Sequence, residues 1–184
     1  LKALGTDWID IWQMHHVNTQ EELERILAPG GALEFALKAQ EQGKVRFIGI
    51  TGHAWEQVQR NLETGHFATV LCWYNCGLRQ AETTVFPTAR SRNLGVVVMN
   101  ATRWRKLLEP PSTWQGPTPT AQDFYRFVLS HPDVHVVLSG VQRIEELEAN
   151  LRVVQEFRPL SEEERAWLLA YGDALREAGY LERR

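Results

Sequence analysis

The sequence predicts an α/β protein whose parallel β-sheet forms part of a (β/α)8 barrel, with about five strands and additional C-terminal helices. Short apolar segments alternate with amphipathic segments of helical periodicity along all 184 residues. Strands that are apolar throughout are typical of parallel sheets covered by helices on both faces. A doubly wound open sheet is the alternative. No G-x-G-x-x-G turn follows any of the apolar segments, which favours the barrel.

The first half of the chain contains three predicted strands. Gly5 ends a helical turn at the amino terminus, and the aromatic and β-branched residues 8–14 then predict the first strand. Helices are expected at 21–28 and 32–42, separated by the Pro-Gly-Gly sequence at 29–31. The next elements, in order, are a strand at 45–51, a helix at 55–63 and a strand at 68–73.

The second half continues the alternation and adds one long irregular segment. A helix at 83–92 and a strand at 95–99 precede residues 102–119, which contain four prolines. Thr120, with Asp123 three residues later, is a predicted N-cap for a helix that extends to residue 130. The remaining elements are a strand at 134–138, a helix at 144–157 and an amphipathic helix at 161–179.

Composition and charge limit the kind of protein. With 43% hydrophobic residues, seven tryptophans and seven phenylalanines, the chain has the composition of a folded domain, which excludes intrinsic disorder. A net charge of −3 and a pI near 6.1 argue against nucleic-acid and membrane-surface partners. No apolar run approaches the roughly 20 residues that cross a bilayer. Two cysteines cannot form a disulfide framework, so a cytoplasmic location is expected.

Length gives a further expectation about organisation. A closed (β/α)8 barrel needs roughly 250 residues, and the chain opens without Met in what reads as the last turn of a helix. We therefore expect residues 1–184 to form a single, incomplete barrel domain that belongs to a longer protein. Five strands would leave two unpaired edges and an uncovered apolar interior. The chain is thus expected to self-associate or to pair with the missing N-terminal part of the barrel.

Several segments that follow one another in register resemble a known family. They are LGTDWIDIWQMH at 4–15, GKVRFIGIT at 43–51, VLCWYN at 70–75, GVVVM at 95–99, VLSHP at 128–132, SG at 139–140 and EELEANL at 145–151. Together they resemble the aldo-keto reductases, from the fourth strand of that family to its C-terminal helices. The resemblance implies a (β/α)8 barrel and nicotinamide-dependent reduction of aldehydes or ketones, with a small-molecule carbonyl compound as substrate.

The family's glycine-rich first turn and its catalytic Asp, Tyr and Lys have no counterpart in this chain. The alternative function is therefore a catalytically inactive, aldo-keto-reductase-like module or fragment that binds a cofactor or a partner. A third alternative is a non-redox barrel fragment, such as an isomerase or aldolase. The predicted strand ends carry no Lys or carboxylate for that chemistry.

Histidine and hydroxyl side chains follow the first two strands. By resemblance, His15 is the active-site histidine, since a neutral imidazole can donate a hydrogen bond to a carbonyl oxygen on which negative charge grows. The alternative is a structural histidine at the barrel mouth. Thr51 and Gly52 align with the family's Ser-Asn pair, which holds the nicotinamide carboxamide. Gly52 lacks the amide, and His53 either substitutes for it or is an ordinary loop histidine.

The later strand ends carry the other expected cofactor residues. Met99, followed by Asn100, either packs against the nicotinamide ring or closes the core. Glu146 stands where the family commonly has a phosphate-binding Arg, so Arg143 becomes the candidate for the adenosine 2′-phosphate. The resemblance favours NADP as the cofactor, and NAD is the alternative. The residues expected by resemblance to bind the adenosine end are Gly140, Gln142, Arg143 and Asn150.

Two tryptophans and two cysteines complete the candidates. Trp104 and Trp114 lie in the long irregular segment, which borders the substrate mouth in a barrel, and are expected to form an apolar substrate wall. Cys72 and Cys76 are spaced C-x3-C, at the edge of structural zinc patterns, and no second pair at matching spacing accompanies them. No metal site is expected.

Overall fold

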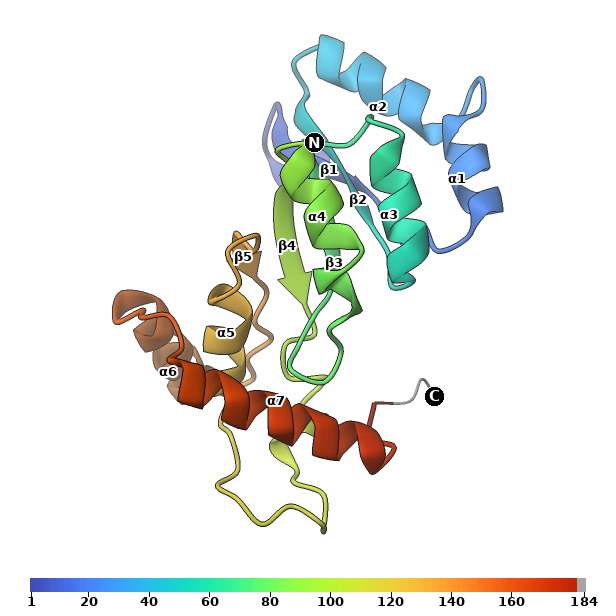
Figure 1. Cartoon of the computed structure of the whole chain (residues 1–184). Coiled ribbons are helices and arrows are strands. Elements are labelled where there is room, and N and C mark those ends of the chain that lie inside the picture. The colour runs from blue at the N-terminus through green and yellow to red at the C-terminus, as the bar shows by residue number, and fades with distance from the viewer. Residues whose placement is uncertain (182–184) are drawn as a thin grey trace. The chain divides into compact units, whose positions relative to one another are not determined.

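The computed structural model, which describes residues 1–181, is an α/β structure with a five-stranded parallel sheet (Figure 1). A sheet whose spatial order follows chain order is the arrangement found in the wall of a (β/α)8 barrel. The predicted fold class is confirmed. The strands, hydrogen-bonded in this order, are β1 (Ile9–Met14), β2 (Val45–Thr51), β3 (Thr69–Trp73), β4 (Gly95–Met99) and β5 (Val136–Val137).

Helices connect the strands at the positions where the sequence predicts them. Gly5 ends the first helical turn in the left-handed conformation (φ 64°), as predicted. No helix within residues 1–181 combines the length and the apolar character that crossing a bilayer would require. The helices are α1 (Gln20–Leu27), α2 (Ala32–Glu41), α3 (Trp55–Glu63), α4 (Val85–Ser91), α5 (Ala121–Leu129), α6 (Ile144–Gln155) and α7 (Glu162–Glu177), with 3-10 turns at Lys2–Leu4, Gln80–Glu82 and Lys106–Leu108.

Strand β5 is shorter than the sequence predicts, with two residues in place of five. It pairs with β4 through Val136 and Val137. The N–H of Val134 donates instead to the carbonyl of His131 at 3.0 Å, which closes a turn. The residues before β5 do not join the sheet, because the N–H of Val134 makes this local hydrogen bond and not one to a neighbouring strand.

The chain forms two compact units. Unit 1 contains Leu1–Cys72 and Glu82–Val96, and unit 2 contains Trp73–Ala81 together with the chain from Val97 onward. Helices α1 to α4 belong to unit 1, whereas α5 to α7 belong to unit 2. The expectation of a single domain over residues 1–184 stays a prediction.

The core of unit 1 is built from β2, β3, α3 and α4. The helices α3 and α4 contact each other, and the face of α3 that carries Val58 and Leu62 is buried, as its helical spacing predicts. Burying each such side chain contributes roughly 1.5–3 kcal/mol. The most buried side chains of this core are Ile50, Val58, Leu62, Val70, Val85, Phe86 and Ala89.

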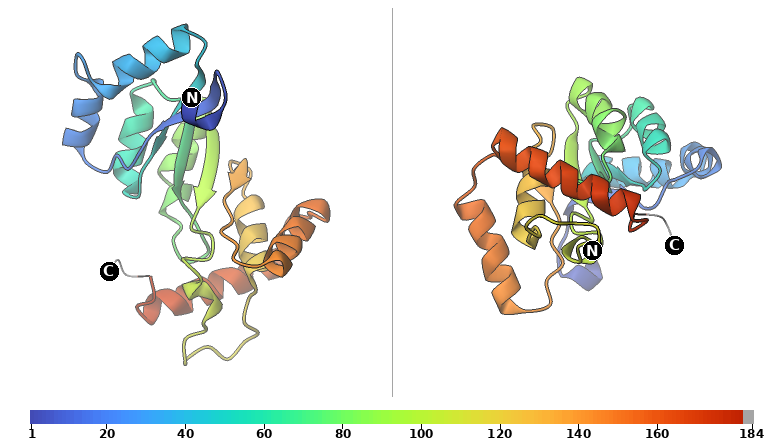
Figure 2. Two further views of the ribbon diagram at one scale, coloured as in Figure 1. Left: turned by 180° about the vertical axis from the view of Figure 1, so that it is seen from behind. Right: turned by 60° about the horizontal axis from the view of Figure 1, so that its bottom comes forward.

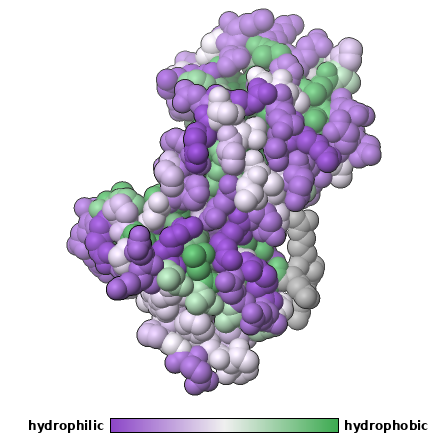
Figure 3. Space-filling model, in the orientation of Figure 1, coloured by the Kyte–Doolittle hydropathy of each residue, from purple (hydrophilic) through white to green (hydrophobic). Residues whose placement is uncertain are grey.

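Strands β1 and β2 also present apolar side chains that stay exposed. The parallel register places Ile11 opposite Phe47, and these residues are 40% and 44% exposed. Figure 3 shows one face of the molecule, on which smaller apolar areas interrupt a largely hydrophilic surface. An exposed apolar pair on the sheet agrees with the expected uncovered interior. Which partner covers it stays a prediction.

Unit 2 is organised around α5, which contacts both α6 and α7 and lies beside them in the two views of Figure 2. The side chains of Phe124, Phe127, Leu168 and Leu175 fill its core with at most 1% exposure. A Cβ at Gly172 of α7 would collide with the backbone of Cys76, so this glycine lets the helix approach that backbone closely.

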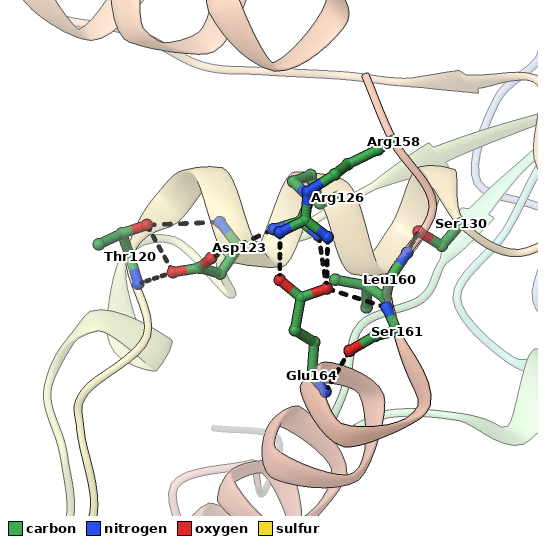
Figure 4. Close-up of polar contacts among 8 residues, drawn as sticks. All are labelled: Thr120, Asp123, Arg126, Ser130, Arg158, Leu160, Ser161 and Glu164. Atoms are coloured by element: carbon green, nitrogen blue, oxygen red, sulfur yellow. Dashed lines mark hydrogen bonds and ion pairs between the residues drawn. The ribbon is translucent and has the colours of Figure 1, made fainter. Parts of the chain in front are cut away.

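The start of α7 is joined to α5 by a charged network around Glu164 (Figure 4). Arg158 donates to both carboxylate oxygens of Glu164, at 2.6 and 2.8 Å, and Arg126 of α5 donates to Oε2 at 2.9 Å. Ser161 caps α7 in a capping box with Glu164. The capping box predicted for α5, between Thr120 and Asp123, is confirmed as well.

This network predicts a specific acid sensitivity. Hydrogen bonds from Arg158, then from Arg126 and the N–H of Ser161, hold the pKa of Glu164 below its ordinary value. A carboxyl with a lowered folded-state pKa stabilises the fold above its unfolded pKa of about 4.3, and this stabilisation is lost as the pH falls below it. We expect Glu164→Gln to lower the free energy of unfolding at pH 7 and to weaken its pH dependence between about pH 5 and 2.

Urea unfolding at several pH values measures both effects, and Glu163→Gln is the matched control. Glu163 lies in the same helical turn and is exposed. The control is expected to follow the wild-type pH profile. Identical profiles for the two variants would contradict the role of Glu164.

Candidate functional site

In unit 1, the residues that follow β1 and β2 are brought together. Met14 pairs with Ile50 at the ends of the two strands. The N–H of His16 donates to Thr51 Oγ1 at 2.8 Å. This contact confirms that the carboxyl ends of β1 and β2 are adjacent. Thr51 is buried at 2% exposure, whereas His15, the residue before His16, is exposed.

His16 determines the direction in which the chain leaves β1. It adopts the left-handed conformation, with φ at 62°, which is uncommon for a residue other than glycine. Its ring lies 4.8 Å from that of His53 in an edge-to-face arrangement. The ring of His15 lies 5.9 Å from that of His16 in a tilted arrangement, so His16 contacts both other histidines, and both His15 and His16 are exposed.

Asn18 is a residue of this region that the sequence analysis missed. Its Oδ1 accepts the N–H groups of both His53 and Ala54, which lie just before the first residue of α3, Trp55. Asn18 thus fixes the turn that leads into α3, from 35 residues away. Spacing along the sequence cannot reveal a contact at that separation.

Packing explains why residue 52 is a glycine, where the resembled family has an Asn. A Cβ at this position would lie 2.5 Å from Val58 Cγ2 and 2.8 Å from the carbonyl oxygen of Val17. An amide side chain therefore does not fit there without displacing α3. Glycine is required because the backbone after β2 passes directly against that helix.

Unit 2 contains two adjoining cavities. The β4–β5 cavity has a volume of about 380 Å³ and lies at the end of β4. The α5–α6 cavity has a volume of about 320 Å³. Thr102, Arg105, Tyr125 and Gly140 line both. Small-molecule sites usually have volumes of about 300–1,000 Å³, so the cavities suit two parts of one extended ligand.

Asn100 is the most informative residue of the β4–β5 cavity. Both polar atoms of its side-chain amide are buried, and neither has a hydrogen-bond partner among the described residues. Its backbone is held in place, since its carbonyl accepts a hydrogen bond from the side chain of Asn75 at 3.1 Å, and its φ is 68°. A buried polar group without a partner costs about 1–3 kcal/mol, so this amide is a candidate contact for a ligand.

Aromatic side chains form another part of this cavity. Trp73 and Trp104 meet edge to face with centroids 5.3 Å apart, and the Arg103 guanidinium lies 5.0 and 4.9 Å from the two rings. Met99 also lines the cavity and is half-buried. Trp104 is 65% exposed, which leaves its ring accessible to a ligand.

Trp114 lies elsewhere. Its ring packs edge to face against Tyr171 of α7, with centroids 5.1 Å apart, and its Nε1 donates to the carbonyl of Pro117 at 3.1 Å. Of the two tryptophans expected in a substrate wall, only Trp104 lines either of these two cavities. In this structure Trp114 holds the irregular segment against α7.

At the start of α6, the expected anion site holds a carboxylate of the protein. Glu146 Oε2 accepts the N–H of Gln142 at 3.0 Å, and Oε1 accepts hydrogen bonds from Arg143 and Arg105. Arg143 was expected to bind a phosphate, but here its guanidinium is paired with Glu146. The three donors hold the pKa of Glu146 at about 2, with the Gln142 N–H as the largest cause.

Asn150 joins a chain of hydrogen bonds across the α5–α6 cavity. Gln122 donates to its Oδ1 at 2.9 Å, and its Nδ2 donates to Ser139 Oγ at 2.7 Å. Ser139 in turn donates to the hydroxyl of Tyr125 at 3.1 Å. Both ends of the Asn150 amide are therefore used within the protein, and they connect α5, α6 and the end of β5.

Burial raises the pKa of one tyrosine and of both cysteines. The hydroxyl of Tyr171 donates to the carbonyl of Leu107 at 2.8 Å, and burial raises its pKa to about 12. No lysine within residues 1–181 hydrogen-bonds a tyrosine. Burial raises the thiol pKa of Cys72 and of Cys76 to about 12, which is typical of inert core cysteines.

Comparison with known proteins gives consistent matches. The model of the aldo/keto reductase family matches residues 1–104. An uncharacterized oxidoreductase, YrpG of Bacillus subtilis, is 34% identical over 103 residues, which are 53% of this chain and 30% of that protein. A probable aldo-keto reductase of Glycine max is 27% identical over 97 residues, 53% of this chain and 26% of that protein.

Solved structures extend the likeness of the fold. The holo form of an aldo-keto reductase from Bacillus halodurans superimposes with a TM-score of 0.74 at 24% identity, covering 94% of this chain and 64% of that one. A thermostable aldo-keto reductase in complex with the inhibitor epalrestat gives 0.68 at 22% identity, covering 92% and 62%.

The chain spans about a third or less of the curated relatives that it matches, and under two thirds of these solved structures. The family match nevertheless covers 104 residues at the amino-terminal side, which include the ends of β1, β2 and β3. Because this match covers more than half of the chain, the protein belongs to the aldo/keto reductase family of oxidoreductases.

Proposed function

We propose that the protein reduces the carbonyl group of aldehydes or ketones with a nicotinamide dinucleotide, and that this chain supplies most of the dinucleotide site. The observation that carries the proposal is the buried, unpartnered amide of Asn100 in the β4–β5 cavity. An amide offers a donor and an acceptor side by side. A planar carboxamide, such as that of nicotinamide, can satisfy both.

The surroundings of Asn100 fit a flat, partly apolar ring. Trp73, Met99 and Trp104 line the same cavity, and aromatic and thioether side chains both pack well on planar rings. A Cβ at Gly140 would meet no atom within 4 Å, so the backbone there leaves room for a ligand that passes between the two cavities. The α5–α6 cavity, with its Arg, Gln and Glu side chains, suits the more polar adenosine end.

The dinucleotide, when bound, supplies the hydride. Unit 1, taken by itself, carries the candidates for the hydrogen bond to the carbonyl oxygen. His15 is exposed at the end of β1, where a neutral imidazole donates a hydrogen bond to a carbonyl oxygen. The Thr51 oxygen accepts from His16, so its own proton is left to donate to a ligand. His53 stays a candidate of the same region.

The source of the proton separates two versions of this function. Reduction requires a proton donor at the developing alkoxide, and general acid catalysis typically supplies roughly 10²–10⁴-fold. Burial raises the pKa of Tyr171 to about 12, and its hydroxyl already donates to the carbonyl of Leu107. This observation favours a second candidate function for the chain by itself, in which it binds a dinucleotide without turnover.

Dinucleotide binding tests the proposal directly. We expect isothermal titration with NADH and NADPH to detect binding of at least one of them, and Asn100→Ala to weaken it by about tenfold because two hydrogen bonds are lost. Asn93→Ala is the matched control. Asn93 is also left-handed, with φ at 54°, so it carries the same backbone cost, and it lines neither of the two cavities. Absence of binding, or equal losses in both variants, would contradict the proposal.

Turnover by the 184-residue chain separates the two versions. We expect no consumption of NADH or NADPH with a panel of aldehydes, because none of its described tyrosines is paired with a lysine. The solution mass of the same sample is expected to exceed that of a monomer, since Ile11 and Phe47 are exposed on the sheet. Rapid turnover by a monodisperse monomer would show that one of these tyrosines is the proton donor.

A further inference from the structure

We propose that Glu146 makes the adenosine end of this site selective for a ribose with a free 2′-hydroxyl, so that NAD(H) is bound in preference to NADP(H). The inference rests on the proposed function, because it concerns the same dinucleotide. Family habit favours the opposite preference. The carboxylate at the start of α6 is the feature that reverses it.

The first argument is the use of the available donors. A 2′-phosphate needs N–H groups and cations that are free to bind it. Here the N–H of Gln142 donates to Glu146 Oε2 at 3.0 Å, and Arg143 donates to Oε1 at 3.0 Å and 3.2 Å. Arg105 also donates to Oε1, and its other terminal nitrogen donates to Gln142 Oε1 at 3.0 Å. The anion position is thus filled by the protein itself.

The second argument is the charge of the cavity wall. The ionisable residues that line the α5–α6 cavity are Arg105, Arg143, Glu145 and Glu146, and their charges sum to zero. Both arginines form ion pairs with the same carboxylate, that of Glu146, and Glu145 supplies the second negative charge of the lining. A phosphate dianion entering here meets no excess of positive charge and lies next to a carboxylate. Like charges in such a position are repelled.

The third argument is the capacity of the carboxylate to accept a hydroxyl. Each carboxylate oxygen has two acceptor positions. Oε1 of Glu146 takes the donors of Arg105 and Arg143, whereas Oε2 takes one N–H, from Gln142. One position of Oε2 is left for a ribose hydroxyl. A carboxylate that accepts the 2′-hydroxyl is the arrangement by which dinucleotide sites select NAD.

The test is titration calorimetry of the 184-residue chain with NADH and with NADPH. We expect the wild type to bind NADH at least about tenfold more tightly than NADPH. Glu146→Gln removes the charge and keeps an acceptor for the Gln142 N–H, and it is expected to tighten NADPH binding by about tenfold. Glu148→Gln, on the exposed part of the same helix, changes the net charge equally and is expected to leave the ratio unchanged.

The outcomes are distinguishable. If both dinucleotides bind and the wild type prefers NADPH or shows no preference, the inference is overturned while the proposed function stands. If neither binds, the proposed function fails and takes the inference with it. If Glu146→Gln does not fold by circular dichroism, the wild-type preference and a comparison of ADP with adenosine 2′,5′-bisphosphate decide the question. A preference of the wild type for the 2′-phosphorylated compound overturns the inference.

Discussion

Parallel pairing of apolar strands is the interaction on which the rest of the structure depends. The pairing of β1 with β2 brings the residues after both strands together, and the bond from the His16 N–H to Thr51 follows from that register. In unit 2, the pairing of β4 with β5 has the same effect for Met99 and the residues after Leu138. Functional side chains on separate strands can form a site because parallel strands end on the same edge.

Three asparagine side chains hold the segments after these strands in place by hydrogen bonds. Asn18 fixes the turn before α3, Asn75 holds the backbone of Asn100, and Asn150 links Ser139 to Gln122. Each buried or half-buried amide makes bonds at both of its ends or to two partners. The amide of Asn100 differs because it has no partner among the described residues. This difference is why the proposed dinucleotide site is centred on Asn100.

Several arginine side chains are likewise paired with carboxylates of the protein. Glu164 forms ion pairs with Arg126 and Arg158 between α5 and α7, and Glu146 forms ion pairs with Arg105 and Arg143 beside the α5–α6 cavity. The first network holds two helices together. The second lies beside a cavity, where the same chemistry determines which anion can enter. An arginine near a helix start is therefore not sufficient evidence for a phosphate site, since its partners decide whether it is available.

The sequence by itself determined the elements and the family. The bounds of β2 and α3 match the predicted ranges, and the Thr120–Asp123 capping box was predicted, because these features depend on periodicity and on bonds between residues three or four apart. Only the tertiary structure decided the partners of Arg143, the contact of Asn18 with the turn before α3 and the isolation of the Asn100 amide. Arg105 and Glu146 are separated by 41 residues. Contacts at such separations arise from packing of strands and helices, and no local spacing encodes them.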